Sequence, residues 1–217
     1  MALYCALVKR AVPRVAVPRL TVYLQCLEDL PPGVTRLSSE DLAVRAGVNS
    51  SKVRKDLSYL GSYGVRGVGY DSEHLRFQIR RELGLTREWP LVIVGVGNLG
   101  RALANYDGFR EQGFQVVGVF DDDPLKVGTW VGSHRVEPLE ALPGAVQERG
   151  ARIGVIATTP EGAQPVAETL AAAGVASILN FAPAVVRVPD HVQVRRVDFS
   201  TELQVLAFHL HQGATAG

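Results

Sequence analysis

The stretch LVIVGVGNLGRALANY, from Leu91 to Tyr106, constrains the fold more than any other part of the chain. A run of aliphatic residues ends in a turn that holds Gly95, Gly97 and Gly100, and a helical segment follows at once. This glycine spacing is a weak signal alone, but between a strand and a helix it is typical of a dinucleotide-binding turn. There the first glycine permits the turn, the second lets the backbone approach a pyrophosphate, and the third lets helix and strand pack closely.

The same alternation of strand and helix continues after this turn. The apolar runs FQVVGVF, ARIGVIAT and VASILNFA are separated by helical segments. Fully apolar strands between helices predict an α/β fold whose parallel sheet is buried on both faces. The later strands end in ATTP and NFAP, which place Thr158 and Asn180 where ligands of such sheets bind. Both side chains could bind the phosphates or the nicotinamide amide, and both could equally be turn residues.

The second strand ends in GVFDDDP, which places Asp121 21 residues after Gly100. An acid at this position can accept hydrogen bonds from both hydroxyls of an adenosine ribose. It would also repel a 2′-phosphate, so the sequence favours NAD(H) over NADP(H). An ordinary acidic turn before a proline is the alternative interpretation.

The chain up to about residue 87 has a different pattern, with short predicted helices and a net positive charge. PRLTVYLQCLEDL places Leu20, Leu24 and Leu27 at helical spacing before PPG ends the helix. Residues 1–90 hold 14 Lys and Arg against 9 Asp and Glu, whereas the remainder holds 9 against 13. A charge asymmetry of this kind suggests that the basic half meets a polyanion.

Two further helices are predicted from their capping residues. Ser38 is a good N-cap with Asp41 three residues later, and Gly47 supplies a C-terminal stop. The next helix, SSKVRKDLSYL, is capped by Asn49 or Ser50. Two short helices joined by a tight turn around a glycine predict a helix-turn-helix.

The second of these helices has one apolar and one basic face. Leu57 and Leu60 each fall within about 40° of Val53 on a helical wheel, so these three residues predict a buried stripe. The opposite face carries Ser51, Arg54, Lys55, Ser58 and Ser62, with Tyr59 at its edge. This face suits a major groove, although a plain solvated surface is the alternative. GSYGVRGVGY, residues 61–70, then predicts a β-hairpin wing with Arg66 at its basic tip.

Composition bounds the remaining possibilities. Apolar residues make up 47% and charged residues 21%, as in ordinary globular proteins. Because no apolar run approaches the ~18 residues of a membrane span and the start does not read as a secretory signal, we expect a cytoplasmic protein. Cys5 and Cys26 are too few for a disulfide framework and lack zinc-site spacing, so we expect no metal.

No catalytic constellation accompanies the glycine turn. The five histidines are scattered, and neither a His–Asp pair nor a Lys/Tyr dyad is evident. A dehydrogenase needs a positioned proton donor or acceptor, so a ligand-reading domain is favoured over an enzyme. An NAD-dependent oxidoreductase with an accessory helical domain remains the alternative, and a CoA-binding module is a third hypothesis that Asp121 disfavours.

The tail STELQVLAFHLHQ predicts a helix with a wide apolar surface. Leu203, Leu206, Ala207 and Leu210 form one stripe, and Val205 and Phe208 widen it. Such a terminal helix is expected to pack between subunits of a homodimer, and docking on its own core is the alternative.

Several blocks together resemble the Rex family of redox-sensing transcriptional repressors. These are VRKDLSYLGSYGVRGVGY, IVGVGNLGRAL, VFDDDPLKVG, ILNFAP and VDFSTELQ, within a resemblance that runs from about Val12 to His211. The resemblance implies a homodimer with an N-terminal winged helix-turn-helix, a C-terminal Rossmann-like parallel sheet and a dimerisation helix exchanged between subunits. The implied domains are 1–88 (1–14 being an extension that can be disordered), 89–199 and 200–217. In this family the NAD+ or apo form holds an inverted-repeat operator, and NADH releases it.

The family pattern also implies site residues. Those expected to bind NADH or NAD+ are Gly95, Val96, Gly97, Asn98, Leu99, Gly100, Tyr106, Asp121, Lys126, Thr158, Thr159, Pro160, Asn180, Phe181, Ala182, Pro183, Asp198 and Phe199. Tyr106, with Asp198 and Phe199 from the other subunit, is expected to sense the nicotinamide. Those expected to contact DNA are Arg19, Ser51, Lys52, Arg54, Lys55, Ser58, Tyr59, Arg66 and Tyr70. Gln25 departs from the arginine that some relatives carry for pairing with the sensing aspartate.

Overall fold

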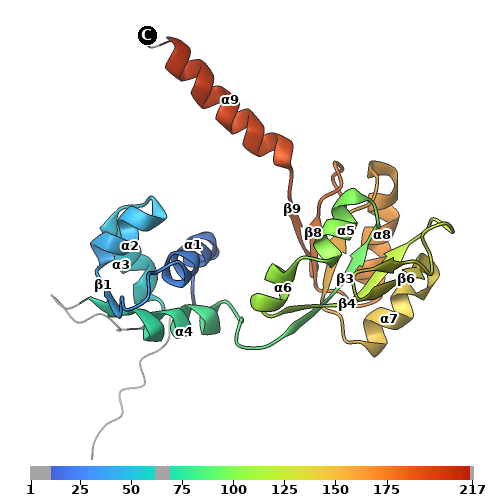
Figure 1. Cartoon of the computed structure of the whole chain (residues 1–217), viewed down its shortest axis with the longest axis horizontal. Coiled ribbons are helices and arrows are strands. Elements are labelled where there is room, and N and C mark those ends of the chain that lie inside the picture. The colour runs from blue at the N-terminus through green and yellow to red at the C-terminus, as the bar shows by residue number, and fades with distance from the viewer. Residues whose placement is uncertain (1–10, 62–68, 216–217) are drawn as a thin grey trace, which may run out of the picture. The chain divides into compact units, whose positions relative to one another are not determined.

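The computed structural model describes residues 11–61 and 69–215, and the chain forms two compact units, Met1–Arg87 and Glu88–Gly217 (Figure 1). Each unit has its own hydrophobic core. Cys5, Ser62, the wing tip with Arg66, and most of the expected N-terminal extension lie outside the described residues. The domain limits at 88 and 199 stay predictions.

The N-terminal unit is mostly helical. Its elements are η1 (Arg14–Ala16), α1 (Val17–Glu28), β1 (Arg36–Leu37), α2 (Ser39–Ala46), α3 (Ser50–Ser58), β2 (Tyr70–Asp71) and α4 (Ser72–Glu82). Strands β1 and β2 pair in antiparallel fashion, with Arg36 opposite Asp71. The two predicted stripes, Leu20, Leu24 and Leu27 in α1 and Val53, Leu57 and Leu60 in and after α3, are buried in one core, as expected.

Capping residues set the bounds of α2 and α3. The Asp41 backbone N–H donates to the Ser38 hydroxyl at 3.0 Å, and the Ser38 N–H donates to the Asp41 carboxylate at 3.1 Å. This confirms the predicted capping box, and Gly47 ends α2 in the left-handed conformation at φ 65°. Asn49, rather than Ser50, caps α3, because its side chain accepts from the Lys52 N–H at 2.8 Å.

The C-terminal unit is built on a seven-stranded sheet. Its elements are β3 (Trp89–Val94), α5 (Asn98–Ala104), α6 (Asp107–Glu111), β4 (Phe114–Asp121), β5 (Trp130–Val131), β6 (His134–Pro138), η2 (Leu139–Ala141), α7 (Leu142–Glu148), β7 (Ile153–Ile156), α8 (Pro160–Ala172), β8 (Ser177–Asn180), β9 (Gln193–Arg196) and α9 (Phe199–Thr215). The described strands run in the order β5-β6-β4-β3-β7-β8-β9, and every neighbouring pair is parallel except β5–β6. From β6 to β9 this is the 3-2-1-4-5-6 order of a Rossmann fold.

Strand β3 shows that the sheet is buried on both faces. Val92 and Val94 pack in the cluster that includes α7 and α8, whereas Leu91 and Ile93 pack in the cluster that includes Ala104 of α5. Successive side chains of a strand point to opposite faces, so the continuous apolar run supplies both cores. The expected parallel α/β sheet is confirmed.

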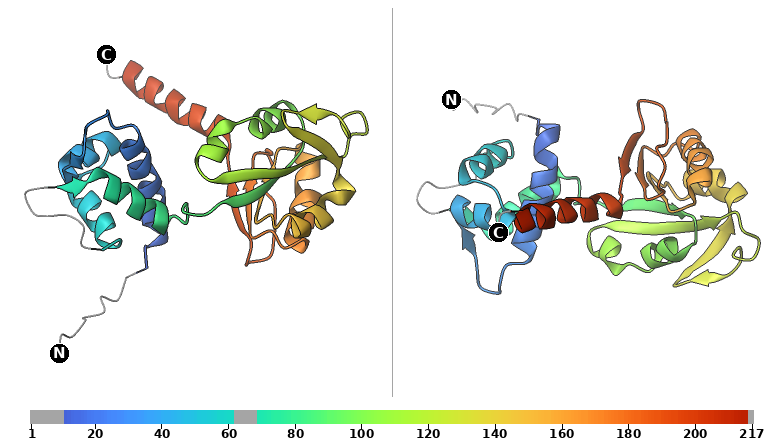
Figure 2. Two further views of the ribbon diagram at one scale, coloured as in Figure 1. Left: turned by 60° about the horizontal axis from the view of Figure 1, so that its bottom comes forward. Right: turned by 90° about the horizontal axis from the view of Figure 1, so that it is seen from above.

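Helix α9 leaves the sheet and projects away from it (Figure 2). Its large apolar side chains are solvent-exposed, including Leu206 at 58%, Phe208 at 57% and Leu210 at 77%. In the single chain, these apolar side chains of α9 therefore do not dock on the unit's own core.

Candidate functional site

The glycine turn after β3 is shaped by close backbone packing. Gly95 has φ +98°, and a Cβ there would lie 2.6 Å from the carbonyl carbon of Ala157, which follows β7. A Cβ at Gly100 would overlap the carbonyl oxygen of Gly95. Beside Gly97, in contrast, no described atom other than those of its chain neighbours comes within 4 Å of such a Cβ. Gly95 and Gly100 thus allow tight packing of the backbone, and Gly97 leaves open space at the start of α5.

A pocket of about 270 Å³ lies at the carboxyl ends of β3, β4 and β7. The strand order reverses between β3 and β7, and this switch point is where open α/β sheets bind their ligands. The expected residues that line the pocket are Gly95, Val96, Gly97, Asp121, Lys126, Thr158 and Thr159. Seven further residues line the pocket that were not expected to bind the cofactor: Val94, Asp122, Leu139, Ala157, Gly162, Pro165 and Val166. Of these, Asp122 had a signal in the sequence, because it belongs to the same acidic run as Asp121.

Asp121 is 3% exposed and its carboxylate is held by the protein itself. One oxygen accepts from the Val96 N–H at 2.6 Å, and the other accepts from the Asp123 N–H at 2.9 Å. The Lys126 ammonium lies 3.2 Å away. Burial alone would raise the pKa of Asp121, but these hydrogen bonds together hold it below its usual value. Asp121 therefore fixes the glycine turn as an anion, and its contact with a ribose stays a prediction.

Asn180 has a role inside its own turn. Its fully buried side chain donates to the Ala184 carbonyl at 2.8 Å and accepts from the Ala182 N–H at 2.9 Å. The structure thus shows the turn role that the sequence left open as one alternative. Of the other expected cofactor residues, Asn98, Leu99, Gly100, Pro160, Phe181, Ala182 and Pro183 do not line the pocket.

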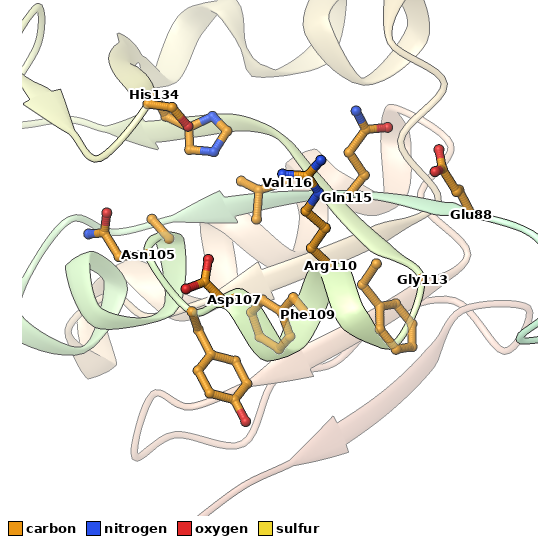
Figure 3. Close-up of a pocket in the computed structure, with 13 residues that line it drawn as sticks. Glu88, Asn105, Asp107, Phe109, Arg110, Gly113, Gln115, Val116 and His134 are labelled. Atoms are coloured by element: carbon orange, nitrogen blue, oxygen red, sulfur yellow. The ribbon is translucent and has the colours of Figure 1, made fainter. Parts of the chain in front are cut away.

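Tyr106 lies apart from the glycine pocket in the single chain. The residue is 59% exposed, and its ring packs edge-on against Phe109, with ring centroids 5.3 Å apart. It lines a second pocket of about 520 Å³ between α6 and the beginning of β4, where Figure 3 shows Asp107, Arg110 and Gln115. His134 also lines this pocket, and burial lowers its pKa.

The expected partners of Tyr106 have other neighbours in this chain. Asp198 pairs with Arg196 at 2.6 Å, and the Phe199 ring lies 6.1 Å from the Phe181 ring. The structure does not place Asp198 or Phe199 among the residues lining either pocket. The sensing role of Tyr106, Asp198 and Phe199 stays a prediction.

Helix α3 presents the expected basic surface. Ser51, Lys52, Arg54, Lys55 and Ser58 are exposed, and Tyr59 is half-buried. Arg54 donates to Glu40 at 2.8 Å and to the Ser39 hydroxyl at 3.0 Å. Tyr70 is half-buried, and burial raises its pKa. The charge of Arg54 lowers this pKa and the charge of Glu40 raises it, with a net increase.

Arg19 is engaged inside the N-terminal unit. Its guanidinium donates twice to the buried Asp56 of α3, at 2.6 and 2.8 Å, and the Tyr23 hydroxyl donates to the same carboxylate at 3.0 Å. Burial raises the pKa of Asp56, but the hydrogen bonds from Arg19 and Tyr23 lower it to a net value below its usual range. Burial and the contact with Asp56 raise the pKa of Tyr23 to about 12. Arg19 thus ties α1 to α3, and its contact with DNA stays a prediction.

Two kinds of site are not found in the described part of the chain. No described helix has the length and apolar character needed to cross a bilayer. No group of three or more His, Cys, Asp or Glu among the described residues could hold a metal ion. Cys26 is half-buried, and burial raises the pKa of its thiol.

Comparison with known proteins finds a matching family for each of the two units. Residues 86–184 match the family model described as a CoA binding domain, and residues 11–58 match the one described as a putative DNA-binding protein N-terminus. The redox-sensing transcriptional repressor Rex of Streptomyces griseus subsp. griseus is 56% identical over 201 residues, which cover 92% of this chain and 79% of that protein. This chain belongs to the Rex family. The expected resemblance to the Rex family is confirmed. The relatives are named as transcriptional repressors, which favours a repressor over the alternative of an NAD-dependent oxidoreductase.

Solved structures support the Rex assignment. RSP, a Rex-family repressor, has been solved in complex with β-NAD+ and operator DNA. The RSP chain in that complex superposes on this chain with a TM-score of 0.88 and is 33% identical to it. The match covers 95% of this chain and 96% of RSP. RSP has also been solved with β-NADH, with a TM-score of 0.87 and 32% identity, over 95% of this chain and 98% of RSP. The predicted fold, a DNA-binding domain joined to a Rossmann-like sheet, is therefore that of the Rex family.

Proposed function

We propose that this Rex-family chain is a transcriptional repressor that holds operator DNA in its NAD+ or apo form and is released by NADH. The observation that carries the proposal is the joining, in one chain, of a glycine-turn pocket at a Rossmann switch point and a basic helix-turn-helix. The Rex repressor RSP has been solved with both redox forms of the cofactor. We place this activity in the cytoplasm, because a repressor must share a compartment with its operator.

The pocket at the glycine turn suits NAD(H). Open space beside Gly97 leaves room for a pyrophosphate at the start of α5, and the anionic Asp121 keeps the turn in place. Bound there, the cofactor supplies a nicotinamide whose charge and ring planarity change on reduction. An exposed tyrosine, Tyr106, is available to contact that ring, together with Asp198 and Phe199 of the partner subunit. Nearly complete switching between two arrangements requires about 5.5 kcal/mol of differential affinity.

The exposed face of α3 is the proposed reader of the operator. Arg54 and Lys55 can reach base edges or phosphates. The hydroxyls of Ser51, Ser58 and Tyr59 can donate hydrogen bonds to DNA phosphates. An inverted-repeat operator requires two such helices, so the DNA proposal also calls for a dimer.

Helix α9 is the proposed dimer contact. Its exposed apolar side chains would be covered if the helix packed against a second subunit, as the family pattern implies. We expect Leu206→Glu to give monomers in analytical ultracentrifugation, whereas Gln204→Glu, which adds the same charge to the same helix, should leave the dimer intact. A dimer in both variants would contradict the proposal.

A mobility-shift experiment tests the repressor itself. The chain is mixed with an inverted-repeat operator duplex, first with NAD+ and then with increasing NADH. We expect a shifted band with NAD+ that disappears at micromolar NADH. Absence of any shift, or a shift that NADH does not change, would contradict the proposed function.

A further inference from the structure

An acidic side chain lies within the proposed DNA-reading surface. Glu40, the second residue of α2, accepts from Arg54 of α3 with one carboxylate oxygen at 2.8 Å and from the Ser39 hydroxyl with the other at 3.0 Å. Arg54 also donates to the Ser39 hydroxyl at 3.0 Å, so the three side chains form a closed ring. The Ser39 residue is 8% exposed, whereas the Arg54 and Glu40 side chains are 53% and 65% exposed.

The carboxylate of Glu40 is charged at neutral pH. Its own backbone N–H, the Ser39 hydroxyl and the Arg54 guanidinium lower its pKa below the usual value. The exposed cations of α3, Lys52 and Lys55, attract phosphates, but an anion among them repels the same phosphates. A solvent-exposed ion pair adds little to folding stability, so the pairing with Arg54 does not by itself explain the acid at this position.

We infer that Glu40 is a specificity-determining residue, which weakens binding to non-operator DNA by competing with phosphates for Arg54. On non-operator DNA, Arg54 gains only a phosphate contact, and the repulsion from Glu40 opposes it. On the operator, Arg54 keeps Glu40 through Nη1 and contacts an uncharged base edge through Nε and Nη2, so neither repulsion nor a lost ion pair opposes that contact. Specificity is a difference between two affinities, and an element that penalises the wrong partner increases it. This inference rests on the proposed role of α3 in reading DNA.

A simpler role for Glu40 is to stabilise the beginning of α2 through the helix dipole. The chain offers a matched control for this role. Glu73 is the second residue of α4, follows Ser72 as Glu40 follows Ser39, and is exposed. Glu73→Gln and Glu40→Gln therefore remove the same charge from equivalent positions of two helices in the same unit.

The test measures the dissociation constants of the full-length wild type and both variants, with NAD+, for an operator duplex and a scrambled duplex of equal length across a range of salt. We expect Glu40→Gln to bind the scrambled duplex about 3- to 10-fold tighter, with less than about 2-fold change on the operator. The salt slope on scrambled DNA should steepen by about 0.9, the value of one additional phosphate contact. Glu73→Gln should match the wild type on both duplexes.

Two results would overturn the inference alone. One is an unchanged affinity and salt slope of Glu40→Gln on scrambled DNA, and the other is an equal gain in Glu73→Gln. If the wild type still prefers the operator, either result removes the role of Glu40 and leaves the proposed repressor function standing. A wild type that binds both duplexes equally would overturn the proposed function and this inference together.

Discussion

Two buried aspartates, one in each unit, have different structural roles: Asp56 joins two helices, and Asp121 holds the glycine turn. Asp56 is 2% exposed and Asp121 is 3% exposed, and both have pKa values below the usual range despite burial. Asp56 is satisfied by side chains of another helix, Arg19 and Tyr23. Asp121 is satisfied mainly by backbone N–H groups, including that of Val96 in the glycine turn.

The partners of each aspartate predict what its loss would do. Asp56 joins α1 to α3, so its removal leaves a buried hydroxyl and a cation without their acceptor and should weaken the fold. Asp121 holds the turn that lines the pocket, so its removal should weaken cofactor binding more than folding. The following variants can break or sharpen this distinction.

The largest effect is expected from Asp56→Ala. Removing one partner of a buried ion pair is strongly destabilising, and because the Arg19 side chain is 30% exposed we expect a loss of about 3 kcal/mol in the free energy of unfolding. Urea denaturation followed by circular dichroism measures this loss. The exposed Asp29, changed to Ala, is the control. A loss below about 1 kcal/mol would show that the ion pair does not hold the helices together.

A smaller effect on folding and a clear effect on ligand binding are expected from Asp121→Ala. Leaving the Val96 and Asp123 N–H groups without their acceptor should loosen the turn by about 2 kcal/mol, which corresponds to about 30-fold weaker NADH binding. Calorimetric titration measures the NADH affinity, and operator binding without NADH should be unchanged. A greater loss in Asp122→Ala would assign the dominant contact to Asp122 instead.

Acid should weaken both aspartate networks. Because the folded-state pKa values are lowered, the stabilisation is fully present above the unfolded value of about 3.9 and is lost as pH falls through the folded values. We expect thermal unfolding to occur at lower temperature at pH 3 than at pH 6. The decrease should be smaller in Asp56→Asn, which has no carboxylate to protonate. An equal decrease in the variant would rule out Asp56 as a source of the acid sensitivity.

The smallest effect is expected from Lys126→Met. The Lys126 ammonium makes only long contacts with the Asp121 carboxylate, at 3.2 and 3.3 Å, so NADH affinity should fall only a few-fold. The backbone N–H donors to Asp121 remain in this variant. Calorimetric titration beside Asp121→Ala gives the comparison. A loss greater than that of Asp121→Ala would mean that Lys126 contacts the cofactor directly.

The sequence predicted the features that depend on local chemistry. The capping box of Ser38 and Asp41 and the glycine turn after β3 each involve residues close together in the chain. The pairing of Arg19 with Asp56 joins residues 37 positions apart, and no pattern in a single sequence indicates it. The family pattern therefore implies only a DNA contact for Arg19 and does not indicate its partner inside the fold.

Some strands also escaped prediction for physical reasons. Strand β6, HRVEP, and strand β9, QVRR, are short and polar because they lie toward the edges of the sheet, so they lack the apolar runs that marked the central strands. The role of Asn180 was left open because an amide after a strand can bind a ligand or its own turn. The folded turn shows the contacts within the turn, and ligand binding by Asn180 stays a prediction.

The central claim is that cofactor binding in one unit controls DNA binding by the other. Coupling between two sites is reciprocal, so NADH and operator must weaken each other's binding by the same factor. The direct measurement is the dissociation constant of NADH with and without saturating operator DNA, beside that of operator with and without saturating NADH. The account predicts two equal factors, each well above one. An NADH affinity that operator DNA leaves unchanged would contradict it.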